Sequence, residues 1–174
     1  MSWSRIVAII TTVSFLAGCG FQPLYGGGKT GPAAAELASI KIEPITDRSG
    51  QILRNHLLDL LTPYGRPAQP KYVLKVILRE GVSGLAVKKS EFATRNELQV
   101  SASYTLFDPA TRKVLFSGSS SITGGYNILN SEFSTMASEQ NVRERVIREI
   151  AGEMQNRLSA FFRLRQEQQG GLTP

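Results

Sequence analysis

The residue best placed for chemistry is Cys19, which is the only cysteine of the chain and ends the run Leu16-Ala17-Gly18-Cys19. A charged start, an apolar run over residues 6–15 and small residues before a cut site are typical of a secretory signal peptide. Small residues followed directly by cysteine form a lipobox, where cleavage before the cysteine leaves a diacylglycerol on its thiol and an acyl chain on the new amine. We therefore predict cleavage between Gly18 and Cys19, and a lipid anchor at Cys19 rather than a nucleophile, a ligand or a disulfide partner.

An uncleaved transmembrane helix is the alternative interpretation of residues 6–15. That run is too short, because a span needs about 20 apolar residues. Each buried methylene contributes about 0.8 kcal/mol, so that one acyl chain binds a membrane only marginally and two hold firmly. We expect the acyl chains on Cys19 to make the attachment permanent.

Catalytic chemistry finds little support in the rest of the chain. His56 is the only histidine and lies four residues from Ile52 and from Leu60, beside an apolar helical stripe, which favours a half-buried structural role. A zinc site would need several His or Cys ligands. Paired carboxylates can hydrolyse glycans, but strand and loop positions explain the three candidates, Glu80, Glu91 and Glu97. We expect no enzymatic activity, no cofactor and no metal.

Basic residues offer a better candidate site. The chain has 20 Lys and Arg against 14 Asp and Glu, a net charge of +6, and one positive charge leaves with the signal peptide. This surplus favours acidic partners, and a location outside the cytoplasm favours lipid phosphates over nucleic acid. Paired cations bind phosphate well. One end of the expected sheet carries Lys88, Lys89 and Arg95, and the opposite end carries Arg112 and Lys113; a solvated basic loop is the alternative.

Hydrophobic periodicity predicts the elements that position these residues. Alternation predicts strands over Ala38–Ile45, Tyr72–Arg79, Asn96–Phe107 and from Lys113 to about Thr123, the last broken by Gly124-Gly125. A helix follows the capping side chains of Asp47-Arg48-Ser49-Gly50 and ends at Pro63. Asp108-Pro109-Ala110-Thr111 reads as a tight turn.

The last predicted element is a long helix. An apolar stripe recurs at helical spacing from Val142 to Phe162. Its arginines either form a solvated face or contact a partner's polar lumen: Arg143, Arg145, Arg148, Arg157, Arg163 and Arg165. We expect a lipidated, flexible tether over 19–36, one domain over 37–165 and a disordered tail over 166–174.

This order of elements predicts an α+β fold. A β-α-β crossover makes the first two strands parallel, and the two hairpins that follow are antiparallel. The simplest arrangement is a two-layer sandwich, with a four-stranded mixed sheet and two α-helices packed on one face. The other face of the sheet, rich in Ser, Thr, Gln and Glu, suits water or a polar partner.

Three runs resemble the LptE family of lipopolysaccharide-assembly lipoproteins, in its alphaproteobacterial form. They are Cys19-Gly20-Phe21-Gln22-Pro23-Leu24-Tyr25-Gly26, Arg48-Ser49-Gly50-Gln51-Ile52-Leu53-Arg54-Asn55, and Thr123-Gly124-Gly125-Tyr126-Asn127 leading into Ser131-Glu132-Phe133-Ser134. The resemblance implies an α/β sandwich of four strands and two helices. It also implies a non-enzymatic, lipid-anchored protein on the periplasmic side of the outer membrane, which plugs and helps assemble an LptD-type β-barrel and assists lipopolysaccharide delivery.

The resemblance also bears on the basic site. Family members are implicated in glycolipid contact through basic residues after the second strand and before the last helix. Here the stretch Asn130–Gln140 has no Lys or Arg. We therefore expect glycolipid contact from Lys88, Lys89 and Arg95 alone.

Two other functions compete with this one. The chain could carry or tether another amphiphile or envelope component, in which case no obligate barrel complex forms. It could also be an envelope hydrolase, in which case changing one carboxylate or His56 abolishes function without loss of fold.

Overall fold

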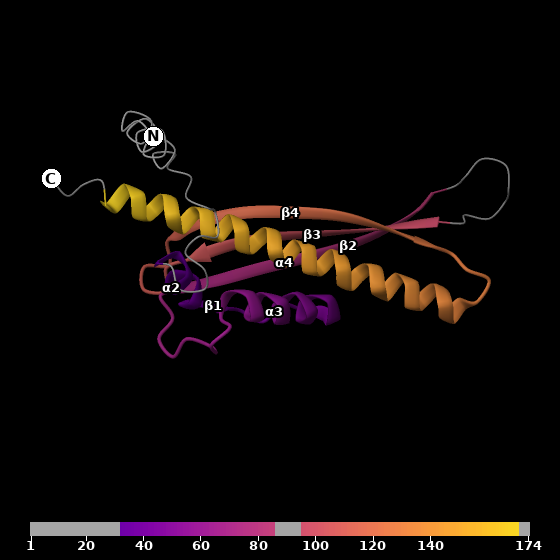
Figure 1. The fold of residues 1–174 in the computed structure, drawn as a ribbon, viewed down its shortest axis with the longest axis horizontal. Helices are drawn as coiled ribbons and strands as arrows, with labels where there is room; N and C mark the ends of the chain where they lie inside the picture. Colours follow the sequence, from indigo (N-terminus) through magenta and orange to yellow (C-terminus); the bar gives the residue numbers. More distant parts are fainter. Residues whose placement is uncertain (1–31, 86–94, 171–174) are drawn as a thin grey trace, which may run out of the picture. The chain divides into compact units, whose positions relative to one another are not determined.

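The sheet and helices of the chain appear in a computed structural model that describes residues 32–85 and 95–170 (Figure 1). Their order is α2 (Pro32–Ala38), β1 (Ile40–Ile42), α3 (Asp47–Leu61), β2 (Tyr72–Leu85), β3 (Arg95–Phe107), β4 (Val114–Asn127) and α4 (Glu132–Gly170). The predicted α+β class and the four strands are confirmed. Helix α2 was not expected, since the predicted tether covers residues 32–36 and a strand was predicted from Ala38.

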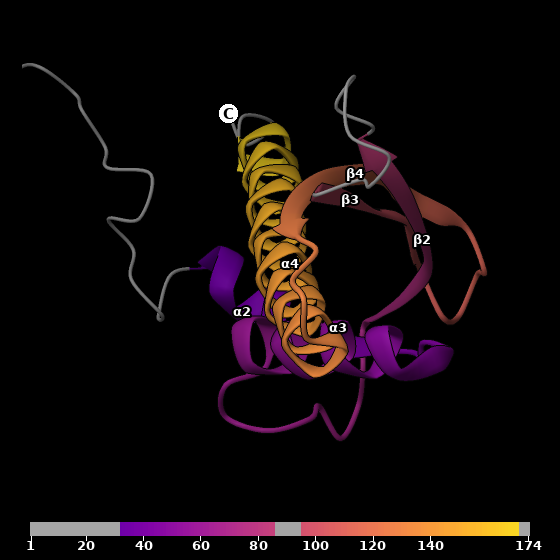
Figure 2. The same cartoon turned by 90° about the vertical axis from the view of Figure 1, so that its right-hand side faces the viewer.

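The strands form one mixed sheet in the order β1-β2-β3-β4. β1 pairs with β2 in parallel, whereas β2 with β3 and β3 with β4 pair antiparallel, as predicted. Figure 2 shows the sheet as a curved layer, with α3 and α4 together on its concave side. The long helices therefore cover one face and leave the other bare.

One apolar core lies between the sheet and these helices. Successive strand residues point to opposite faces, and the alternate residues of β3 that face the helices are all buried: Leu98, Val100, Ala102, Tyr104 and Leu106. The predicted stripe of α4 is buried against them: Val142, Val146, Ile147, Ile150, Met154, Leu158 and Phe162. From α3, the residues Leu53, Leu57 and Leu61 complete the core.

The prediction that Gly124-Gly125 ends the last strand is wrong, because β4 continues to Asn127. Packing explains these glycines. A Cβ on Gly124 would lie 2.5 Å from Val142 Cγ1, and one on Gly125 would lie 2.7 Å from a guanidinium nitrogen of Arg95. Neither glycine has a positive φ. They give room to neighbouring side chains and do not turn the chain.

Other boundaries also differ from the prediction. β1 is only three residues long, whereas β2 extends to Leu85. α4 begins at Glu132, well before the apolar stripe, and runs to Gly170 through the expected tail. The extra turns at its C-terminal end are rich in Glu, Gln and Arg, which favour helix without burial.

The start of α3 differs in its capping. Its N-cap residue is Thr46, which makes no side-chain capping bond, so the predicted capping by residues 47–50 is wrong. Gly50 has a packing role, since its Cβ would lie 2.7 Å from Ile45 Cγ2. The predicted turn at Asp108 is confirmed, because Asp108 Oδ1 accepts the N–H bonds of Ala110 at 2.8 Å and Thr111 at 3.2 Å.

We expect Gly124→Ala to destabilise the fold by about 1–3 kcal/mol, because its methyl group would force α4 away from β4. Gly81→Ala is the matched control on β2, where a Cβ would have nothing within 4 Å. Urea unfolding followed by circular dichroism measures both. Equal midpoints for the two variants would show that α4 can move away from β4 without cost.

Candidate functional site

The bare side of the sheet is a polar surface that β2, β3 and β4 build together. We define the open face by the outward-pointing residues in the central part of three strands: Lys75, Ile77, Arg79, Gln99, Ser101, Ser103, Thr105, Ser117, Ser119, Ser121 and Thr123. Seven of these are Ser or Thr. Of the large apolar residues among them, only Ile77 stands out, with 52% of its surface exposed. Most side chains of the open face are therefore short and carry a hydroxyl group.

Some hydroxyls of the open face bond to one another across the strands. The Oγ atoms of Ser101 and Ser121 lie 2.9 Å apart, and Gln99 Nε2 donates to Ser121 Oγ at 3.3 Å. Cross-strand pairs of this kind hold the register of a sheet. The remaining hydroxyl capacity points outward, so the open face can exchange water for a polar partner without leaving buried donors unpaired.

The predicted basic site lies at the end of the sheet where β2 and β3 meet. Arg95 opens β3 there, opposite Leu85, while Arg112 and Lys113 lie between β3 and β4 at the opposite end, as predicted. Lys88 and Lys89 lie outside the described residues. Of the three residues predicted to contact glycolipid, the structure therefore describes Arg95 alone.

Arg95 has a neighbour that the sequence did not suggest. Its guanidinium lies over Gly125 of β4, on the side of the open face. On the helix side of the same strand, Arg145 Nη2 lies 3.7 Å from the Cβ position of Gly124. Both arginines are exposed, and neither makes an ion pair within the described residues. Only the register of β4 shows that they flank adjacent residues.

A polar network ties α4 to three strands near this end. Arg143 on α4 pairs with Glu80 of β2 at 3.1 Å and with Glu139 at 2.5 Å. Tyr126 of β4 donates its hydroxyl to Glu139 at 3.2 Å and accepts a bond from Asn96 of β3 at 3.2 Å. Burial disfavours the guanidinium charge, but the bonds to Glu139 and Glu80 outweigh it and raise the pKa of Arg143.

A second polar cluster joins α4 to β4 farther along the helix. Ser120, which is only 4% exposed, donates to Glu153, and Arg157 pairs with Glu153 at 2.5 Å. The bond from Ser120 and the contacts with Arg157 lower the pKa of the Glu153 carboxyl. Burial raises the pKa of the neighbouring Tyr104 hydroxyl. These groups hold the helix in place.

None of these clusters has the make-up of a hydrolase. Of the predicted carboxylates, Glu80 is held by Arg143, Glu97 lies in β3 and Glu91 is outside the described residues. His56 is half-buried on α3, as its place beside the apolar stripe suggested. Within the described residues, no group of three His, Cys, Asp or Glu side chains could hold a metal ion.

A hollow of about 420 Å³ opens beside the N-terminus of α3. Its lining comes from α3, β2 and α4, and includes Arg48, Ile52, Leu78, Glu80 and Arg143. Ser49, Asp47 and Glu144 also line the hollow, whereas His and Cys are absent from its lining. The carboxylate of Glu80 is ion paired with Arg143.

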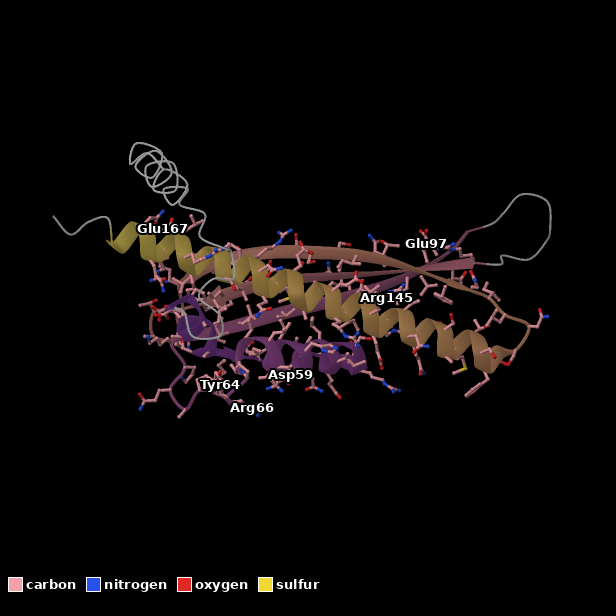
Figure 3. All side chains as sticks on the ribbon, in the orientation of Figure 1. Asp59, Tyr64, Arg66, Glu97, Arg145 and Glu167 are labelled. Carbon is pink, nitrogen blue, oxygen red and sulfur yellow. The ribbon has the colours of Figure 1, made fainter. Side chains whose placement is uncertain are left out.

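An exposed apolar group lies where β4 leads into α4, in a stretch with no predicted element. It consists of Ile128, Leu129, Phe133 and Met136, of which Phe133 is 81% exposed. Thr135 fixes this connection, because its Oγ1 accepts a bond from Leu129 N at 2.9 Å and donates to Leu129 O at 3.2 Å. Figure 3 labels two residues on the elements near this connection, Arg145 on α4 and Glu97 on β3. Among the helices in residues 32–85 and 95–170, none combines the length and the hydropathy of a membrane span.

This fold is found in several solved bacterial lipoproteins. A lipoprotein from Caulobacter crescentus matches with a TM-score of 0.62 and 22% identity, over 83% of this chain and 99% of that one. Rare lipoprotein B from Shewanella oneidensis matches with a TM-score of 0.56 and 12% identity, over 72% and 98%. A minor lipoprotein from Acinetobacter baumannii matches with a TM-score of 0.56 and 19% identity, over 70% and 91%. These matches define the fold as one shared with bacterial lipoproteins.

The family follows from the sequence match. The model of the lipopolysaccharide-assembly family LptE matches residues 37–158, so the chain belongs to the LptE family. Among curated proteins, none matches the chain.

We expect Glu153→Gln to change how the free energy of unfolding depends on pH in acid. Because the folded-state pKa of Glu153 lies below its ordinary value of 4.5, this carboxylate stabilises the fold above that pH and loses its effect as the pH falls through the folded-state pKa. The stability difference between wild type and Glu153→Gln should therefore shrink below pH 4.5, as measured by urea midpoints at pH 7 and in acid. Glu149→Gln, on the exposed side of the same helix, is the control and should show no such change.

Proposed function

We propose that this protein is a non-enzymatic outer-membrane lipoprotein that plugs an LptD-type β-barrel, helps it assemble and assists lipopolysaccharide delivery to the outer leaflet. Membership of the LptE family supports a role in lipopolysaccharide assembly. The observation that carries the plug role is the open face, a full side of the sheet that no described helix covers.

The chemistry of the open face fits the inside of a barrel. The wall of a membrane barrel is apolar outside and polar inside. A plug must therefore present a polar surface that does not carry a large charge of one sign. The open face meets this requirement, since seven of its residues are Ser or Thr and only two, Lys75 and Arg79, are charged.

The proposed anchor keeps the domain near such a partner. Cleavage before Cys19 would leave residues 19–31 between the lipid and α2. Fully extended, that segment spans at most about 45 Å. Acyl chains on Cys19 would thus hold the domain next to the periplasmic side of the outer membrane, within reach of a membrane-embedded barrel.

Lipopolysaccharide contact is proposed at the end of the sheet that carries Arg95. Lys88 and Lys89 belong to the connection between β2 and β3 and would add two cations near Arg95. Guanidinium and ammonium groups bind phosphate through charge-assisted hydrogen bonds. The exposed Arg145 on the other side of β4 increases the positive charge at this end.

A second candidate function is that of a lipoprotein that carries or tethers another amphiphile or envelope component. The exposed apolar group around Phe133 favours it, since acyl chains bind to apolar surfaces. The two functions differ in their partner, because only the plug forms an obligate complex with a barrel.

The deciding experiment is affinity purification of the tagged, lipidated protein from detergent-solubilised envelopes, with mass spectrometry of what co-purifies. We expect one large outer-membrane β-barrel at near one-to-one stoichiometry. Recovery of the protein alone, or with peptidoglycan or inner-membrane components only, would rule out the plug and favour the carrier.

Cys19→Ala tests the anchor in the same preparation. We expect the unlipidated variant to leave the outer-membrane fraction, because the acyl chains supply the membrane affinity. Immunoblots of separated periplasmic, inner-membrane and outer-membrane fractions measure this. A variant that stays in the outer membrane and is fully functional would refute anchoring through Cys19.

Ser103→Arg tests the open face at its centre. If this face meets the barrel wall, an unpaired guanidinium there should reduce co-purified barrel at least about tenfold, since burying an unpaired charge costs several kcal/mol. Asn55→Arg, at a position on α3 that is also exposed, is the control for the added charge. Equal recovery with both variants would show that the open face does not contact the barrel.

A further inference from the structure

β4 is the outermost strand of the sheet, and its outer edge pairs with no other described strand (Figure 1). It is 14 residues long and contains no charged residue and no proline. In an antiparallel ladder, every second residue of an edge strand directs its N–H and C=O away from the sheet. β4 thus presents a long row of backbone donors and acceptors on one side.

Edges of this kind are normally blocked. Soluble proteins protect them with short strands, lysines, prolines, bulges or a covering element, because an open edge pairs with other chains. The other edge of this sheet is protected in that way. β1 covers the start of β2, and the uncovered part of β2 carries Lys75, Arg79 and Glu80. The edge at β1 and β2 is therefore protected against pairing, whereas the edge at β4 is not.

Core packing explains the small residues of β4 on its helix side only. On the helix side, Gly118 leaves space for the Tyr104 ring, and Gly124 leaves space for Val142. On the open face, Ser117, Ser119 and Ser121 are exposed and pack against no helix. Packing therefore leaves the absence of any charge along β4 unexplained.

Helix α4 packs against the core-facing side of β4. The contacts run from Glu153 to Ser120 and from Val142 to Gly124, both residues that point toward the core. One arginine flanks β4 on each side at Gly124-Gly125, Arg145 on the helix side and Arg95 on the open face. Both guanidinium groups are exposed and would attract a carboxylate placed beside these glycines.

We propose that β4 pairs along its outer edge with an extended strand of a partner polypeptide, which carries an acidic residue next to Gly124-Gly125. Hydrogen bonding selects this occupant, since only another extended backbone matches a row of alternating donors and acceptors; strand addition to a free edge is a known mode of peptide recognition. The two arginines supply the charge complementarity. The inference rests on the proposed function in one respect, namely that the strand comes from the envelope partner.

Hydrogen exchange of the backbone amides tests this pairing. The full lipidated chain is compared alone in detergent and in the complex purified from envelopes, with single-residue resolution by mass spectrometry. We expect every second amide of β4 to exchange at least about tenfold more slowly in the complex, because pairing protects only the outward-pointing N–H groups. The amides of β3 provide the internal reference, since both sides of β3 are already paired.

The outcomes separate this inference from the proposed function. A barrel that co-purifies while β4 exchange stays unchanged would overturn the pairing and leave the plug intact. Alternating protection in an assembly whose native mass contains only copies of this chain would overturn the partner strand in favour of self-pairing. A chain recovered alone with unprotected β4 would overturn both.

Matched lysine substitutions on the two edges sharpen the test. Ser119→Lys adds to β4 the kind of charge that blocks an edge, and should reduce the protection of β4 at least about tenfold. Ser83→Lys is the control, since Ser83 is exposed on the free edge of β2, on the same face of the sheet. It should change β4 exchange by less than about threefold. Equal effects of the two substitutions would refute pairing at β4.

Discussion

The packing of α4 against the concave side of the sheet is the contact on which the rest of this structure depends. No cysteine besides Cys19 exists, so no disulfide can hold the domain together. The stripe from Val142 to Phe162 is buried against β3, β4 and α3. Removal of this apolar surface from water is the main source of stability for a domain of this size.

That contact sets which residues β4 carries on its helix side. A helix packed this closely leaves no room for side chains at Gly124, and Gly118 must make space for the Tyr104 ring. Two polar clusters then fix the position of the helix along the strand. One is centred on Arg143, which joins β2 to α4, and the other on Glu153, which accepts from Ser120. Both clusters use charge to position the helix.

Concentration of both long helices on one side frees the rest of the sheet for other roles. The open face offers hydroxyl groups, β4 offers backbone groups at its edge, and the end near Arg95 offers positive charge. These three surfaces adjoin one another on β2, β3 and β4. A domain with this division can serve as a rigid subunit whose contacts lie on its exposed strands.

The sequence by itself determined the α+β class, the four strands with their pairing directions and the stripe of α4. Each of these depends on local patterns, namely period-two alternation and helical spacing. Local patterns also identified the turn at Asp108. The lipid anchor at Cys19 and the glycolipid contact of Arg95 stay predictions, as do Lys88 and Lys89, which lie outside the described residues.

Only the tertiary structure decided what the small and charged residues do. Gly124-Gly125 reads as a strand break in sequence, yet it makes room for Val142 and Arg95, which lie far away in the chain. The pairing of Arg143 with Glu80 and the approach of Arg145 to β4 depend on how α4 crosses the strands. Such long-range contacts leave no periodic signal, because the energy comes from neighbours that only the folded chain brings together.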